Sequence, residues 1–284
     1  MLGQYLIAFR EVLEAALITA IILSYLIRSD RRNLIRYVWY GAILAIIVSL
    51  SLGVFIQLVY GSLAKTSQLL FEALAAFIAV AVLSSMIYWM AVKGKYIKQE
   101  MEKQVEVATA HGSTIVGLIS IVFIVVFREG LETVLFLTPL LFQDTIGTLI
   151  GTTIGMLTAV ALSYAIFKAG MKINLHRFFY FTSILLILLA AGLAGYGIHE
   201  AIEYAEETGI QLGWLSQHAY SLGIPSDSPF HHKGVIGSIF AVMFGYTVNP
   251  EWARLIVHVA YLAIMLPIVI WIYKWKNTWI LQDA

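Results

Sequence analysis

Two short segments of the sequence carry the same set of charged side chains. Residues 9–14 read Phe-Arg-Glu-Val-Leu-Glu, and residues 127–132 read Phe-Arg-Glu-Gly-Leu-Glu. In a helix, positions i, i+3 and i+4 share one face, so the arginine and both glutamates of each segment lie together. Carboxylates are hard oxygen ligands that suit Mg²⁺, Ca²⁺, Mn²⁺ and ferric iron. The repeated motif therefore predicts an acidic cation site with six charged members: Arg10, Glu11, Glu14, Arg128, Glu129 and Glu132.

Both copies of the motif lie in apolar segments, where a charge at the bilayer centre costs about 2.5–3.5 kcal/mol. Each arginine can pair with the glutamate one turn later, yet four carboxylates face only two guanidinium groups. The surplus negative charge favours a cation over an anion. Ion pairs that only lock helix packing would explain one such motif, but they explain poorly the surplus acid of two copies.

The composition indicates a membrane protein. Of the 284 residues, 60% are hydrophobic and 12% are charged, whereas a soluble domain has roughly 25% charged residues. The net charge of +1 gives no reason to expect a nucleic-acid partner. The absence of cysteine excludes disulfides, thiolate metal sites and Fe–S clusters. The first apolar segment lacks the basic start of a signal peptide, so we expect it to remain in the mature protein.

Seven segments are long and apolar enough to cross a lipid bilayer as helices, which takes about 20 residues each. They are residues 3–27, 37–59, 69–92, 114–142, 146–168, 178–198 and 253–273. A shorter apolar stretch, residues 235–244, predicts a re-entrant or interfacial helix. We therefore expect an all-α, polytopic membrane protein with a single transmembrane domain over residues 1–284.

The basic residues are distributed unevenly between the loops of this seven-helix arrangement. Thirteen of the 18 lysines and arginines follow the first, third, fifth and seventh predicted spans. Cytoplasmic loops are enriched in lysine and arginine. This face is therefore predicted to be cytoplasmic, with the N-terminus outside and the C-terminus inside.

The two copies of the motif lie in the first and fourth predicted spans, so they run in opposite directions through the membrane. This pattern predicts an inverted repeat of three plus three helices with one added C-terminal helix. Many secondary transporters are built in this way, with the substrate site at the repeat interface. The predicted parts are repeat 1 (about 1–95), a cytoplasmic linker (about 95–113), repeat 2 (about 114–204), and an outer loop, re-entrant stretch and seventh span (about 205–284).

A rise of about 1.5 Å per residue gives the expected depth of each motif carboxylate. Counted inward from position 4, Glu11 lies about 10 Å deep and Glu14 about 15 Å. Counted from position 143 in the oppositely directed helix, Glu132 lies about 16 Å deep and Glu129 about 21 Å. We therefore expect a vertical ladder of oxygen ligands, with Glu11 at its outer end and Glu129 at its inner end.

The doubled Arg-Glu-x-Leu-Glu motif resembles the signature of the high-affinity iron permeases, the oxidase-dependent iron transporters of fungi and their bacterial counterparts. The resemblance covers most of the chain and includes Tyr88-Trp89-Met90 in the third span and Phe244-Gly245-Tyr246 before the seventh. It implies a permease and not an enzyme, lying in the cytoplasmic membrane as a multi-pass protein. It also implies that the arginines and glutamates of the motif are needed for iron passage.

The same resemblance implies that iron is the transported substrate and that no cofactor is permanently bound. The cargo is expected to be ferric iron delivered by an oxidase partner. Since the chain starts almost directly at the first span, we expect this donor to be a separate protein: a ferroxidase, a peroxidase or a periplasmic iron-binding protein.

Four further residues are weaker candidates for metal contact: Glu72, His199, Glu200 and Glu203. Glu72 lies one turn into the third span, where it either joins the pathway or sits in the outer interface. The His-Glu-x-x-Glu segment that starts at His199 closes the sixth span on the outer side. This segment either collects hard cations or is an ordinary solvated helix end.

Two other functions stay open on the sequence. A permease for another divalent cation, such as Mn²⁺ or Pb²⁺, would use the same carboxylates. A membrane enzyme with a di-iron carboxylate centre would use Glu-x-x-His pairs on its helices, and the sequence contains no such pair.

Overall fold

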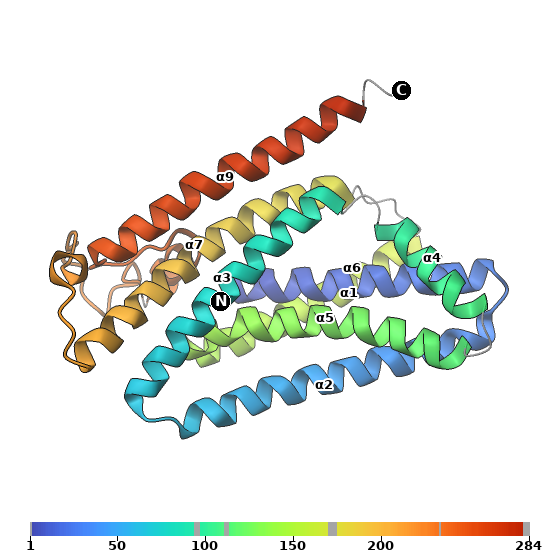
Figure 1. Ribbon diagram of the computed structural model, residues 1–284, viewed down its shortest axis with the longest axis horizontal. Helices are drawn as coiled ribbons and strands as arrows, with labels where there is room; N and C mark the ends of the chain where they lie inside the picture. The colour runs from blue at the N-terminus through green and yellow to red at the C-terminus, as the bar shows by residue number, and fades with distance from the viewer. Residues whose placement is uncertain (1, 94–96, 111–113, 170–174, 233, 281–284) are drawn as a thin grey trace.

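The computed structural model describes residues 2–93, 97–110, 114–169, 175–232 and 234–280, and it confirms an all-α architecture for this part of the chain (Figure 1). Its long helices are α1 (Leu2–Arg28), α2 (Ile35–Ser62), α3 (Lys65–Lys93), α5 (Thr114–Gln143), α6 (Thr145–Ala169), α7 (Leu175–Glu207) and α9 (Trp252–Ile280). Its shorter helices are α4 (Ile97–Ala110), α8 (Val235–Phe244) and the 3₁₀ helices η1 (Arg32–Leu34) and η3 (Gly213–Ser216).

Each predicted apolar segment coincides with one long helix, and the shorter stretch coincides with α8. The helix ends follow from local chemistry. Asp144 alone separates α5 from α6, and its Oδ1 accepts a hydrogen bond of 2.9 Å from the Gly147 N–H, which caps α6. Gly245 ends α8 in the left-handed conformation, with a φ of 63°, which glycine adopts without strain.

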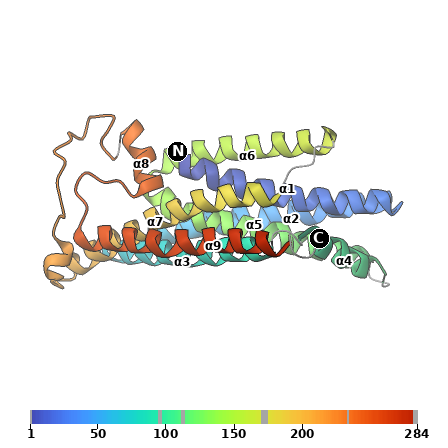
Figure 2. The same cartoon turned by 90° about the horizontal axis from the view of Figure 1, so that it is seen from above.

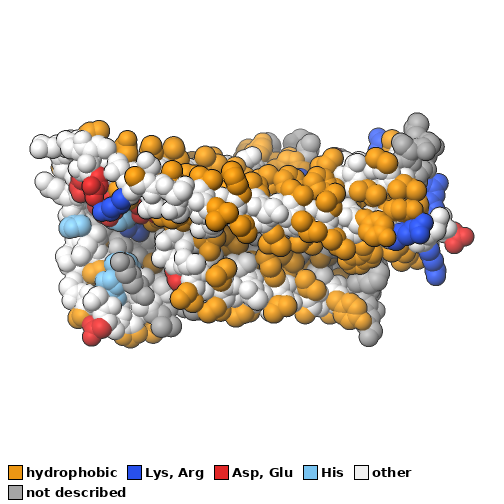
Figure 3. Space-filling view, turned by 90° about the horizontal axis from the view of Figure 1, so that it is seen from below, with side chains coloured by type: hydrophobic (Ala, Val, Ile, Leu, Met, Phe, Trp, Pro, Cys, Tyr) orange, Lys and Arg blue, Asp and Glu red, His pale blue; other side chains and the backbone are white. Residues whose placement is uncertain are grey.

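By length and composition, five helices of the described residues can cross a membrane: α2, α3, α6, α7 and α9. The helices α1 and α5 are of similar length, 27 and 30 residues, but each carries the charged motif. Figure 3 shows hydrophobic side chains over the middle of one face and charged side chains toward its two ends. The count of seven spans and the orientation of the termini stay predictions. Three lysines of the charge argument, Lys95, Lys172 and Lys233, lie outside the described residues.

The long helices form two groups that cross at an angle (Figure 1). One group contains α1, α2, α5 and α6, and the other contains α3, α7 and α9; seen from above, all of them run along the same long axis (Figure 2). Within the first group, α1 packs most closely against α6, and α5 packs most closely against α2. Each motif helix therefore packs against the second helix of the other predicted repeat. This exchange of partners fits an inverted repeat, which stays a prediction.

Glycines allow both of these close pairings. A Cβ on Gly155 of α6 would lie 2.5 Å from the Tyr5 carbonyl oxygen of α1, and one on Gly41 of α2 would lie 2.7 Å from a carbonyl oxygen of α5. Small residues of this kind let membrane helices approach closely. Beside these contacts, Tyr5 stacks on Phe9 and Phe123 stacks on the aromatic ring one turn later, at positions that correspond in the two motif helices.

The apolar core of the described residues is divided into two clusters, and the motif lies between them along α1 and α5. One cluster joins α1, α3, α5, α7 and α9 and includes Ile7 and Phe136, which precede the motif in α1 and follow it in α5. The other joins α1, α2, α4 and α5 and includes Ile18 and Val126 on the opposite side of the motif. The fold thus places the six motif charges between two blocks of packed hydrocarbon.

Candidate metal site between α1 and α5

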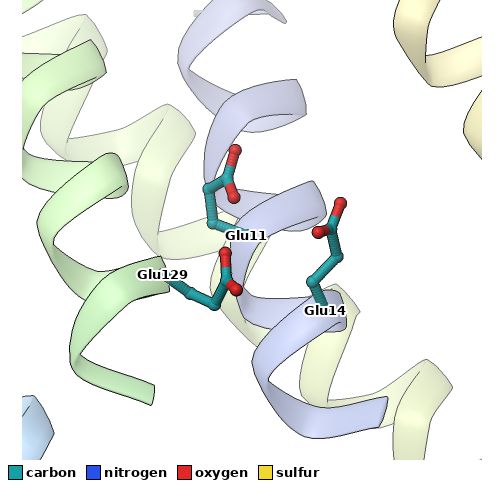
Figure 4. Close-up of side chains that lie close together, drawn as sticks. All are labelled: Glu11, Glu14 and Glu129. Atoms are coloured by element: carbon teal, nitrogen blue, oxygen red, sulfur yellow. The ribbon is translucent and has the colours of Figure 1, made fainter. Parts of the chain in front are cut away.

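Three motif carboxylates converge on one point. Glu11 and Glu14 extend from α1, and Glu129 extends toward them from α5 (Figure 4). Each offers a ligand oxygen, and these oxygens lie within 4.8 Å of one another. The three side chains are almost fully buried, with exposed fractions of 0%, 4% and 1%. The fourth glutamate, Glu132, is also buried and lies one turn from Glu129 on α5.

Each arginine of the motif bridges the two glutamates of its own helix. Arg10 places Nη1 at 2.6 Å from Glu11 and Nη2 at 2.7 Å from Glu14, and its side chain is buried. Arg128 places Nη2 at 2.8 Å from Glu129 and Nε at 3.5 Å from the second glutamate of α5, and its side chain is 45% exposed. The two copies of the motif, in α1 and α5, therefore form the same ion pairs, but the arginine is buried in α1 and partly exposed in α5.

The arginines leave part of the oxygen set free. One oxygen each of Glu11, Glu129 and Glu132, Oε2 in every case, has no hydrogen-bond partner among the described residues. A buried carboxylate oxygen without a partner is costly. The cost is offset if a cation binds there, because oxygen donors of this kind are what hard metal ions prefer. The geometry therefore fits a cation site formed jointly by α1 and α5.

Helix α3 supports both arginines, a role that the sequence did not indicate. The Nη1 of Arg10 lies 3.1 Å from the Met86 sulfur. The guanidinium of Arg128 lies over the Trp89 ring, 5.1 Å from its centre, which is a cation–π contact. Apolar side chains in an apolar helix give no periodic signal for such contacts. Only the family resemblance had drawn attention to the segment that contains Trp89.

The expected ladder of carboxylates is wrong in its spacing, because Glu11 and Glu129 lie in one cluster and not at its opposite ends. The depth estimate assumed that positions 4 and 143 lie at the same depth in the membrane. Instead, the Gln4 amide donates to the Thr148 hydroxyl at 3.2 Å, and that hydroxyl donates to the Leu140 carbonyl at 2.9 Å. Taking Gln4 as level with Leu140 reduces the depth difference between Glu11 and Glu129 from about 11 Å to about 6 Å. Two glutamate side chains can span the remainder.

The weaker candidate Glu72 is buried in a hydrogen-bonded group. Its Oε1 accepts a hydrogen bond of 2.5 Å from the Tyr60 hydroxyl, and its Oε2 accepts one from the Tyr196 hydroxyl. Glu200 is buried beside this group. Neither tyrosine was singled out from the sequence, since the two lie on different helices and in no shared motif.

The weaker candidate His199 is engaged by two carboxylates. Its Nδ1 lies 2.8 Å from Glu251 and its Nε2 lies 3.4 Å from Glu203. Burial of the Glu251 carboxyl opposes ionisation, but the hydrogen bond and charge of His199 outweigh it and hold the pKa of Glu251 below its usual range. The interaction between His199 and Glu251 links α7 to the residue that precedes α9. Metal collection by the segment that begins at His199 stays a prediction.

The close approach of α2 to the motif gives a stability prediction. A Cβ on Gly130 would lie 2.2 Å from the Ser49 Oγ and 2.8 Å from the Ser49 Cβ. Gly130→Ala should therefore lower the free energy of unfolding by about 1–3 kcal/mol through overpacking. Thermal unfolding in detergent measures this loss, and adding Ser49→Gly should recover part of it. A Gly130→Ala protein as stable as the parent would contradict the close packing of α2 on α5.

Residues 1–271 match the model of the iron permease FTR1 family. The chain is 44% identical over 269 residues to an uncharacterized protein of Archaeoglobus fulgidus, covering 95% of this chain and 94% of that one. It is 35% identical over 264 residues to the ferrous iron permease EfeU of Yersinia pestis, covering 92% and 90%. The same identity over 264 residues holds for EfeU of Escherichia coli O6:H1, covering 92% of both chains. No solved structure matches the chain.

Proposed function

Because the chain belongs to the iron permease FTR1 family, whose members transport iron across membranes, we propose that iron passes through it by way of the carboxylate cluster between α1 and α5. The observation that carries this proposal is the convergence of Glu11, Glu14 and Glu129. Two helices that approach from different parts of the sequence bring three buried acids together. Ion pairing alone does not require this, because each arginine already forms ion pairs with the glutamates of its own helix.

The proposal requires α1 and α5 to cross the membrane together with the five more apolar helices. Both are longer than the about 20 residues that a span needs. Both are packed within the bundle, α1 against α6 and α5 against α2. We infer seven spans with the N-terminus outside, arranged as an inverted repeat plus α9. The substrate site then lies at the repeat interface, as in other transporters of this construction.

The arginines have a role when the site is empty. Four carboxylates so close together repel one another, and Arg10 and Arg128 reduce this repulsion without occupying all of the oxygens. An arriving cation binds the free oxygens and neutralises the surplus charge. Its departure leaves carboxylates that can take up protons in its place. An inward movement of iron would then be coupled to an outward movement of protons.

The packing on either side of the cluster bears on how iron moves. Ile7 and Phe136 belong to the apolar cluster on one side, and Ile18 and Val126 belong to the cluster on the other. A hydrated ion does not pass through packed hydrocarbon, so the helices must move for iron to reach or leave the site. We infer alternating access around a fixed site in place of a continuously open pore.

We propose that the cargo is ferric iron supplied by a separate oxidase, because all the ligands in the cluster are hard anionic oxygens and the motif resembles that of the oxidase-dependent permeases. The relatives are named for ferrous iron, which makes Fe²⁺ the competing cargo.

Uptake into proteoliposomes tests the proposal. The purified chain is reconstituted and offered Fe²⁺, Fe³⁺ as its citrate complex, or Mn²⁺, each with and without a pH gradient. We expect iron uptake above that of protein-free vesicles, increased by a gradient that is acidic inside, because protons leave the vesicle as iron enters. Uptake of Mn²⁺ in preference to both forms of iron would instead support the divalent-cation alternative. Absence of any metal uptake would reject the permease, and uptake of Fe²⁺ alone would reject the ferric proposal.

A further inference from the structure

A second group of oxygen ligands lies far from the motif, where three helices meet. Tyr60 near the end of α2 and Tyr196 of α7 both donate hydrogen bonds to Glu72 of α3, one to each carboxylate oxygen. Glu200, one turn after Tyr196, lies within hydrogen-bonding reach of the Tyr196 hydroxyl. Two carboxylates and two phenols are thus gathered where α2, α3 and α7 meet.

Three of these four side chains line a cavity of about 740 Å³: Glu72, Tyr196 and Glu200. The same cavity reaches Gln4 of α1. The Gln4 side chain is only 2% exposed, and its carbonyl oxygen Oε1 has no hydrogen-bond partner among the described residues. This buried amide oxygen, left unpaired in the wall of the same cavity, is a further hard donor available to a cation.

The cavity borders this group and reaches the N-terminal end of α1, the helix that carries the first copy of the motif. Glu72 precedes Met86 by 14 residues on α3, which is about 21 Å along the helix, and Met86 contacts Arg10 of the motif. Gln4 precedes Arg10 by six residues on α1, or about 9 Å. The tyrosine-containing group is therefore separate from the motif cluster, and the cavity extends from it toward that cluster.

The donor set fits a trivalent cation. We propose that four side chains form an outer binding site for ferric iron: Tyr60, Glu72, Tyr196 and Glu200. This proposal rests on iron transport by the chain and adds where the metal binds before it reaches α1 and α5. Two carboxylates and two phenolates carry four negative charges, so Fe³⁺ leaves a charge of −1 and Fe²⁺ leaves −2. Arg254, which also lines the cavity, offsets the smaller surplus.

Binding converts the two phenols to phenolates. Each oxygen–hydrogen bond breaks as an iron–oxygen bond forms, and the proton passes first to the Glu72 oxygen that accepts it now and then to water in the cavity. One ferric ion therefore displaces two protons, and no electron is transferred. The hard anionic phenolate oxygen favours Fe³⁺ over Fe²⁺ and over Mn²⁺. The outer site would then select the oxidised metal as it enters.

Visible spectroscopy tests this assignment, because phenolate bound to ferric iron gives a charge-transfer band in the visible range and carboxylate alone does not. The purified full chain in detergent is titrated with ferric citrate. We expect the band in the parent protein, a weaker band in Tyr60→Phe and in Tyr196→Phe, and no band in the double variant. The affinity for ferric citrate in the double variant should fall at least tenfold. Tyr261→Phe, which removes a partly buried hydroxyl 2.8 Å from Ser84, is the matched control and should keep the band.

The motif variants separate this proposal from the one on which it rests. Glu129→Gln should keep the charge-transfer band while losing transport. If the parent protein takes up iron but shows no band, or if the band survives in the double tyrosine variant, the outer site is wrong and the permease stands. Loss of the band in Glu129→Gln would likewise contradict the assignment of the ferric site to the tyrosines. The single variants keep the test valid if the double variant does not fold.

Discussion

Replacing Glu129 by glutamine is expected to lower iron uptake by on the order of a hundredfold while the protein still reaches the membrane. Glu129 is the α5 carboxylate that lies within 4.8 Å of both α1 carboxylates. Glutamine keeps the shape of the side chain but removes one negative charge and one anionic oxygen from the centre of the cluster. The measurement is radioactive iron uptake into proteoliposomes that contain equal amounts of parent and variant protein.

The control for this prediction is Glu206→Gln, which makes the same chemical change at an exposed position near the end of α7. It should transport iron at the parent rate. Glu14→Gln should reproduce the loss seen with Glu129→Gln, since it removes a ligand from the α1 side of the same cluster. Parent-like uptake by Glu129→Gln would show that iron does not pass through this cluster.

Replacing Arg10 by methionine should have the largest effect on stability. Arg10 is buried and contacts Glu11 at 2.6 Å and Glu14 at 2.7 Å. Removing one partner of a buried ion pair costs about 3–5 kcal/mol, because the other charge is left without compensation. We expect a markedly lower thermal-unfolding midpoint in detergent and reduced accumulation in the membrane.

Two comparisons make this second prediction specific. Adding Glu11→Gln to Arg10→Met removes one of the stranded charges and should restore part of the lost stability. Arg128→Met should cost less than Arg10→Met, because the Arg128 side chain is 45% exposed whereas that of Arg10 is buried. Equal losses for the two arginine variants would contradict the difference in burial between the two copies of the motif.

The helices were predictable from the sequence because long apolar segments have few alternatives in a membrane. All seven apolar segments form helices, and even the short stretch that became α8 was found. The charged motif was also predictable, since a helix places Arg10, Glu11 and Glu14 on one side by its period alone. These features depend only on residues that are close together in the chain.

The features that the sequence did not predict depend on the register between neighbouring helices and on the angles at which they cross. The register of α1 against α5 reflects the contact of Gln4 with Thr148, which lies outside the motif and on a third helix. The support of the arginines by Met86 and Trp89 depends on the angle at which α3 crosses them. The rise of about 1.5 Å per residue along one helix determines neither the register between two helices nor their crossing angle. The predicted ladder was therefore too widely spaced, although three of its four members were brought together.

An iron-specific anomalous diffraction map of crystals grown with iron tests the central claim most directly. The account predicts an iron peak bounded by the carboxylates of Glu11, Glu14 and Glu129, within bonding distance of oxygens from both α1 and α5. Iron bound elsewhere in the protein, with no peak between these two helices at saturating iron, would contradict it.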